Sequence, residues 1–226
     1  MIKINNLTKK YKDKLAVDNL NLEIKTGELF SLLGTNGAGK TTTIKMLSTL
    51  ILPTSGEVEI NNLDLVKDSS KIKEIINISP QETAVASNLT VLENLYFMAG
   101  IYQIPNKEDK IKELIKLFKL EEVLKQKAKT LSGGYQRKLS IAISLINNPK
   151  ILFLDEPTLG LDVISRHDLW KVIELLKGKT TIILTTHYME EAEVLSDRIG
   201  IMNKGKLIEL GTSKELIKKA KTKNFE

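Results

Sequence analysis

ELFSLLGTNGAGKTT, residues 28–42, carries the strongest indication of the fold of this chain. Its apolar first part, 28–33, predicts a short buried strand, and residues 43–50 predict a helix after a glycine-rich loop. The loop matches the pattern G-x-x-x-x-G-K-[ST] in the strand–loop–helix context that this pattern requires. Four residues make the match: Gly34, Gly39, Lys40 and Thr41. A glycine-rich turn without a ligand is the alternative, and the context makes it the weaker one.

The backbone of this loop is suited to phosphate. Glycine residues allow successive N–H groups to converge on phosphate oxygens. The Lys40 ammonium is expected to reach the β- and γ-phosphates of a nucleotide, and the Thr41 hydroxyl is expected to bind Mg²⁺. We therefore expect ATP to contact every residue of the loop and the start of its helix: Gly34, Thr35, Asn36, Gly37, Ala38, Gly39, Lys40, Thr41 and Thr42.

A second strand should bring acidic residues to the same site. ILFLDE, residues 151–156, predicts a buried strand with Asp155 and Glu156 at its carboxyl end, where open α/β sheets bind ligands. Asp155 could hold Mg²⁺ through water, and Glu156 could polarise the water that attacks the γ-phosphate. Both residues could instead cap the following turn, in which case the protein would bind a nucleotide without hydrolysing it. The glycine loop favours the Mg²⁺ interpretation.

Two further polar residues follow predicted strands. Gln81 comes just after a strand at 75–79, and His187 just after a strand at 180–186. Because both strands should end at the same edge of the sheet, we expect both side chains in one crevice. Gln81 could then meet the metal and the attacking water, and His187 the γ-phosphate. The other histidine, His167, lies within a predicted helix, and we expect a structural role for it.

LSGG, residues 131–134, is a second anion-binding signature. It precedes an apolar-periodic run and predicts a helix N-terminus, where backbone N–H groups attract anions. A helix N-terminus contributes at most about 2 kcal/mol toward an anion. Millimolar affinity requires about 4 kcal/mol. This segment could therefore not hold ATP alone, but it could add a second face to ATP that the glycine loop already holds.

Taken together, these motifs resemble those of one family, the ATP-binding subunits of ABC transporters. The resemblance covers essentially the whole chain and rests on six segments: GTNGAGKTT, ISPQE, LSGGYQRKL, ILFLDEPT, LGLD at 159–162, and TTHYMEEAE. It implies two cassettes packed head to tail with two ATP molecules between them. It also implies roles for five more residues. Ser132, Gly133 and Gly134 would face the γ-phosphate across the interface, Asp162 would link the two sites, and Tyr11 would stack on adenine.

Some residues depart from the family pattern. Tyr135 stands where glutamine is common, with Gln136 following it, and Leu159 stands where a small or polar residue is common. The first difference puts in doubt a direct contact from that position. Tyr11 also has an alternative, as an aromatic side chain that packs on its own lobe. None of these changes removes a predicted catalytic group.

The fold class expected is α/β, a P-loop NTPase with a parallel-sheet core. We expect a single cassette over 1–226, with an antiparallel β-lobe that includes 15–24 and 57–60. Residues 91–147 should be mostly helical, broken at Pro105, within a helical subdomain at roughly 84–147. Further elements predicted are a helix at 163–176, a last helix before two strands (IGIMN and KLIEL), and a C-terminal helix.

Composition limits the classes of function. Hydrophobic residues make up 42% and charged residues 27%, with no cysteine and no apolar run of the roughly 18–20 residues that span a bilayer. The net charge of +6 comes mostly from scattered lysines, which favours a solvated surface over affinity for nucleic acid or for an anionic membrane face. Arginine occurs at only three positions: Arg137, Arg166 and Arg198.

Such a cassette needs a membrane partner for transport. The resemblance implies a separate transmembrane permease, docking on roughly 82–105, and a location at the cytoplasmic face of the membrane. Tyr96, Phe97 and Tyr102 could be contact residues there or could pack in the core. TTHYMEEAEVLSDRIGIMNKGKL, residues 185–207, is most similar to export-type cassettes.

The alternative function is an ABC ATPase that acts on ribosomes or DNA. Such proteins usually carry two cassettes or a long coiled coil, and this chain shows neither.

Overall fold

The computed structural model describes residues 1–223. Within them, the central sheet has six strands in the order β10-β9-β3-β8-β7-β6. Strands β3 (Leu29–Leu33), β6 (Ile76–Ser79), β7 (Ile151–Asp155), β8 (Thr181–Thr186) and β9 (Arg198–Asn203) run parallel, and β10 (Lys206–Gly211) runs antiparallel to β9. The predicted parallel α/β core is confirmed.

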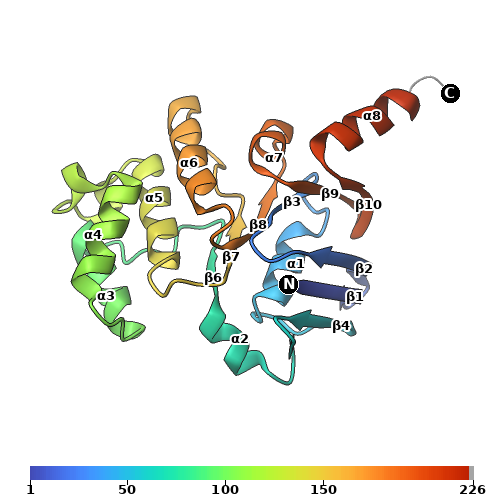
Figure 1. Ribbon diagram of the computed structural model, residues 1–226, viewed down its shortest axis with the longest axis horizontal. Helices are drawn as coiled ribbons and strands as arrows, with labels where there is room; N and C mark the ends of the chain where they lie inside the picture. The colour runs from blue at the N-terminus through green and yellow to red at the C-terminus, as the bar shows by residue number, and fades with distance from the viewer. Residues whose placement is uncertain (224–226) are drawn as a thin grey trace.

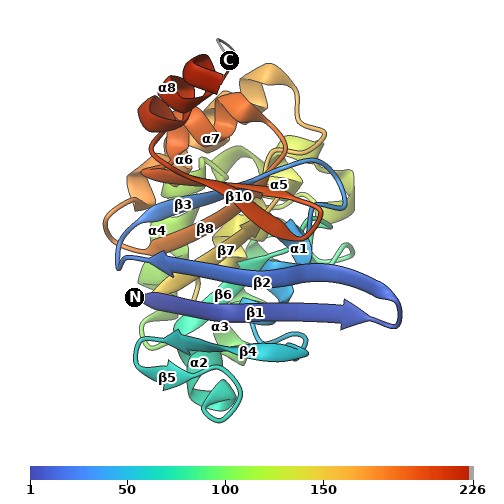
Figure 2. The same ribbon diagram turned by 90° about the vertical axis from the view of Figure 1, so that its right-hand side faces the viewer.

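A second sheet forms the N-terminal lobe. It has the order β2-β1-β4-β5, and all its neighbours are antiparallel: β1 (Ile2–Tyr11), β2 (Lys14–Ile24), β4 (Ser55–Ile60) and β5 (Leu63–Asp64). Figure 2 shows this sheet beside the edge of the central one. The Asp18 N–H donates to the Gly205 carbonyl (2.9 Å), and Lys206 pairs with Asp18. The antiparallel lobe is confirmed, although β1 and β5 were not predicted.

Helices gather at the opposite end of the molecule, as Figure 1 shows for α3 (Val91–Ile101), α4 (Lys107–Phe118) and α5 (Gly133–Ser144). The start of α3 is fixed by a capping box between Thr90 and Glu93. The predictions that 91–147 is mostly helical and that the run breaks at Pro105 are confirmed, and a second break follows α4. Lys119 ends α4 with a φ of 53°, and 119–132 contains only two short 3₁₀ turns, Glu121–Val123 and Ala128–Thr130. The bounds of a helical subdomain stay a prediction.

The helix after the glycine loop differs from its predicted limits. It spans Lys40–Leu47 (α1), so it begins directly at the loop and ends before residue 50. Thr49 adopts a φ of 62°, which turns the chain away toward β4. The remaining helices are α2 (Ser69–Ile75), which was not predicted, α6 (Val163–Leu176), α7 (Met189–Leu195) and α8 (Ser213–Lys223). The bounds of α6 match the prediction.

The core lies on both faces of the central sheet. Along β7, Leu152 and Leu154 pack in one buried cluster with the helical end, whereas Ile151 and Phe153 pack in another with α1 and the lobe. This alternation follows from the two-residue period of a strand. Covering both faces buries β3, β7 and β8 along their whole length, which explains their mainly apolar sequences. Among the described helices, none has the length and apolar composition that a membrane crossing requires.

Candidate nucleotide site

The glycine loop and the ends of the central strands enclose a cavity of about 280 Å³. Its lining comes from the loop and from three other parts of the chain: Lys14, Ala16, Asn36, Gly37, Ala38, Gly39, Lys40, Thr41, Thr42, Gln81, Glu156 and Leu159. Gly39 has a φ of 105°, and a Cβ there would lie 2.5 Å from the Ala16 carbonyl oxygen. Only glycine fits this position, so the lobe and the loop pack backbone to backbone. Most of the predicted ATP-binding loop therefore lines one cavity.

A neighbouring hollow of about 430 Å³ continues from the other side of the loop. Gly34, Thr35 and Asn36 line it together with His187 and Met189. The prediction that His187 lies near the loop is thus in agreement with the structure. Asn36 lines both spaces, so the two cavities adjoin at the loop.

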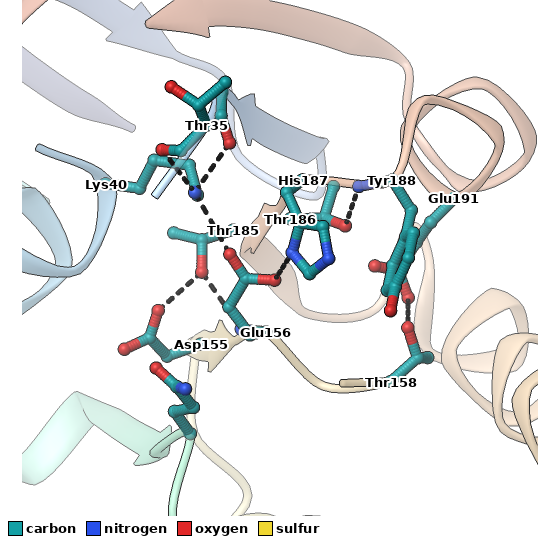
Figure 3. A network of polar contacts seen from close by, with 12 residues as sticks. Thr35, Lys40, Asp155, Glu156, Thr158, Thr185, Thr186, His187, Tyr188 and Glu191 are labelled. Carbon is teal, nitrogen blue, oxygen red and sulfur yellow. Dashed lines mark hydrogen bonds and ion pairs between the residues drawn. The ribbon is translucent and has the colours of Figure 1, made fainter. Parts of the chain in front are cut away.

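Lys40 and Glu156 form a buried ion pair at this loop. The Lys40 Nζ atom lies 3.1 Å from Glu156 Oε1, and the side chains are 5% and 6% exposed. Lys40 also donates hydrogen bonds to the carbonyls of Gly34 (2.8 Å) and Thr35 (3.3 Å), as Figure 3 shows. An ammonium held in this way points into the space between the loop and β7. When a phosphate enters, the Lys40 ammonium can bind its oxygens in place of the carbonyl and carboxylate oxygens that it contacts here.

The second oxygen of Glu156 contacts His187. His187 Nδ1 lies 2.7 Å from Glu156 Oε2, and Figure 3 shows the Glu156 carboxylate between Lys40 and His187, with one oxygen toward each. The His187 ring also contacts the Tyr188 ring, with centroids 4.0 Å apart. Glu156 has a φ of 48°, an unfavourable conformation for a residue with a Cβ. Such a backbone conformation persists where the surrounding structure holds it in place.

Asp155 lies beside the loop helix. The hydroxyls of Thr41 (3.0 Å) and Thr185 (2.5 Å) both donate to Asp155 Oδ1. Within residues 1–223, no group of three or more His, Cys, Asp or Glu residues could hold a metal by itself. Magnesium suits such a place, because it is usually held by one or two protein oxygens together with phosphate and water. The Thr41 and Asp155 oxygens fit this requirement, and Gln81 lines the same cavity.

The LSGG segment lies away from the cavity that its own chain forms. Ser132 caps α5 by accepting from the Tyr135 N–H (3.4 Å), and Asp162 caps α6 by accepting from the Ser165 N–H (3.0 Å). These two helix N-termini lie side by side, because a Cβ on Gly134 would be 2.8 Å from Ser165 Oγ. None of the LSGG residues, Asp162 or the exposed Tyr11 is among the cavity residues. Their predicted roles remain predictions.

Two buried charged residues at the site were not predicted from the sequence. The Arg137 guanidinium is buried against the ends of β6 and β7. The Glu191 carboxylate accepts from Thr158 (2.8 Å) and from the Trp170 indole (2.9 Å), and burial raises its pKa. No signal in the sequence marked either residue.

Comparisons with known proteins agree with this geometry. The sequence model of the family described as ABC transporter matches residues 17–159. The chain is 43% identical to human phospholipid-transporting ATPase ABCA3 over 94% of its own length, and it spans 13% of that relative. It is 41% identical to the linearmycin resistance ATP-binding protein LnrL of Bacillus subtilis, over 96% of this chain and 70% of LnrL.

Among solved structures, one match is the ATP-binding cassette MJ0796, described as dimeric in a post-hydrolysis state bound to ADP and Pi. The TM-score is 0.84 at 31% identity, covering 94% of this chain and 98% of that one. The fold and the site thus define a P-loop ATPase. The chain belongs to the ABC transporter family and is one of its ATP-binding cassettes.

Proposed function

We propose that the chain hydrolyses ATP between two cassettes, and that hydrolysis drives the export of a substrate through a separate transmembrane permease. The observation that carries the proposal is the position of Glu156. Its carboxylate lies between the Lys40 ammonium and the His187 ring, at the mouth of the phosphate-binding loop. Relatives described as phospholipid-transporting and as conferring linearmycin resistance support a transport function.

Binding of the phosphates would fall to the loop. Lys40 would place its charge on the β- and γ-phosphates, and the loop N–H groups would surround them. Mg²⁺ would be held by the Thr41 hydroxyl and the Asp155 carboxylate, with the Gln81 amide oxygen nearby. When bound, the ion neutralises charge between the β- and γ-phosphates. The separation of 3.0 Å between Thr41 Oγ1 and Asp155 Oδ1 supports this assignment.

Glu156 would orient and polarise the attacking water. Its carboxylate contacts two side chains within residues 1–223 and does not cap the following turn, which supports catalysis over the capping alternative. His187 would hold the Glu156 carboxylate in place and reach the γ-phosphate from the other side. Removing a general base usually lowers a rate by about 10²–10⁴-fold.

A second cassette would complete each ATP site. Ser132, Gly133 and Gly134 would supply the N-terminus of α5 to the other cassette's γ-phosphate, and Asp162 would contact the other site. Tyr11 would stack on adenine from its own lobe. The position of LSGG away from its own cavity supports this arrangement, as does the dimer described for the similar cassette. ATP held by both cassettes would make dimerisation depend on ATP.

Permease docking would use the outer face of α3. A groove of about 580 Å³ is lined there by residues of the helical end: Thr90, Leu92, Glu93, Tyr96, Phe97, Leu124 and Lys125. Phe97 is 55% exposed, and Ile101 on the same helix is 56% exposed. Exposed apolar residues that line a groove are typical of a protein contact. Attachment to a permease there would place the cassette at the cytoplasmic face of a membrane.

The test of this function is co-purification from detergent-solubilised membranes. The tagged wild type should recover a membrane protein, and Phe97→Ser should reduce the recovery at least tenfold. Ile208→Ser is the control, because Ile208 is 54% exposed on β10, far from the groove along the chain. Recovery of ribosomes or DNA without any membrane protein would overturn the transport proposal in favour of the alternative function.

A further inference from the structure

Arg137 joins three elements of the site through a single buried guanidinium. The residue lies one turn into α5 and is 3% exposed. Its Nη1 donates to the Pro80 carbonyl (2.6 Å), just past β6. Its Nη2 donates to the carbonyls of Gln81 (3.1 Å) and Glu156 (2.7 Å), with a longer contact to Asp155 (3.4 Å). One side chain of α5 therefore holds the ends of two neighbouring strands.

The acceptors are backbone carbonyls, although carboxylates lie nearby. Burial lowers the pKa of Arg137, while the charges of Asp155, Glu191 and Glu156 act in the opposite direction. A buried cation that binds carbonyls of separate strands fixes the distance and angle between them. The planar guanidinium fork suits this task, because its N–H groups point in fixed directions. A lysine ammonium at the end of a flexible chain cannot hold both strand ends in the same geometry.

The strand ends that Arg137 holds belong to residues with proposed chemical roles. Gln81 lines the nucleotide cavity, and Glu156 places its carboxylate between Lys40 and His187. Glu156 has a left-handed backbone, with a φ of 48°. A non-glycine residue keeps this conformation only where its surroundings impose it. The Arg137 hydrogen bond to the Glu156 carbonyl, together with the Glu156 N–H bond to Thr185 (3.1 Å), imposes it here.

The same helix begins with LSGG. We propose that Arg137 is a positioning residue through which α5 aligns Gln81 and Glu156 of its own site when its N-terminus engages the nucleotide held by a second cassette. This inference rests on the proposed function of LSGG. Gly134 and Arg137 lie three residues apart in one rigid helix, so a shift of the N-terminus moves the guanidinium with it. The alignment of Gln81 and Glu156 in one ATP site would thereby depend on whether LSGG of the same cassette contacts ATP in the other site.

The test compares Arg137→Lys and Arg137→Met with Arg198→Lys. The Arg198 side chain also donates to a backbone carbonyl, that of Glu23 (3.1 Å), and it lies on β9 away from the cavity. ATPase rates are measured well below the unfolding midpoint of each variant, so that unfolded protein does not contribute. We expect kcat to fall about 10- to 100-fold for Arg137→Lys and further for Arg137→Met. KM for ATP should change less than threefold, and Arg198→Lys should match the wild type.

A second measurement separates positioning from dimer formation. In a Glu156→Gln background, Arg137→Lys should still form the ATP-dependent dimer, because nucleotide contacts are retained. Wild-type kcat in Arg137→Lys would overturn the inference, as would a rise in KM that accounts for the whole loss of activity. If Glu156→Gln alone hydrolyses ATP at the wild-type rate, the proposed function itself fails, which is a distinct result.

Discussion

Glu191 shows how strongly a single residue at this site depends on its surroundings. Its side chain is fully buried, and one carboxylate oxygen accepts hydrogen bonds from the Thr158 hydroxyl and the Trp170 indole. Burial raises its pKa above the ordinary value of 4.5, and the charge of Glu156 acts in the same direction. Ionising it therefore costs more in the folded chain than in the unfolded one.

The raised pKa of Glu191 makes the stability of the folded chain depend on pH. Because the folded pKa is raised, the stability that Glu191 contributes is present below pH 4.5 and is lost as pH rises through the folded pKa. Glu191→Gln removes this loss. Its free energy of unfolding, relative to the wild type, should therefore be higher at pH 8 than at pH 5 in urea titrations. Glu190→Gln, an exposed neighbour, serves as the control. An equal difference at both pH values would contradict the argument.

At the scale of elements, the packing of α5 against α6 brings two capped N-termini together. Gly134 is needed for this contact, because a Cβ there would lie 2.8 Å from Ser165 Oγ and 3.1 Å from Ser165 Cβ. Gly133 is one residue earlier in the same helix, yet a Cβ there would have its nearest neighbour at 3.9 Å, on Leu161. Packing against α6 therefore requires glycine at position 134 but not at position 133.

This difference predicts unequal effects of substitution. Gly134→Ala should lower the free energy of unfolding by about 1–3 kcal/mol, because the added methyl group overpacks the contact with Ser165. Gly133→Ala should leave stability unchanged or raise it slightly, since alanine favours helix. Urea unfolding of both variants checks this. Equal losses would show that the close approach of α5 and α6 is not required.

At the scale of the whole molecule, the topology collects the site. Strands β3, β6, β7 and β8 are parallel neighbours, so their carboxyl ends meet at one edge of the sheet. The loop before α1, Gln81, the pair at 155–156 and His187 each follow one of these strands. The parallel sheet itself therefore places these four parts of the site next to one another, although they are far apart in the sequence.

The parts of the site that follow strand ends were predictable from the sequence, because strand ends and short motifs are local signals. Strand β1 was not, because its alternation is interrupted where Asn6 adopts a φ of 49° and its register shifts. The segment 119–132 has helical composition but turns through Lys119 at positive φ. Arg137 was missed because its acceptors are backbone atoms of residues 80, 81 and 156, which carry no side-chain signal.

Hydrolysis of ATP held between two cassettes should depend on the Glu156 carboxylate. This dependence can be measured by size-exclusion chromatography with ATP and Mg²⁺ on the wild type and on Glu156→Gln, with ATPase rates measured in parallel. The variant should hydrolyse ATP about 10²–10⁴-fold more slowly, keep ATP bound and elute as a dimer that the wild type forms only transiently. Normal hydrolysis by the variant would contradict the role of Glu156. An inactive, ATP-bound variant that remains a monomer would contradict the pairing of two identical cassettes.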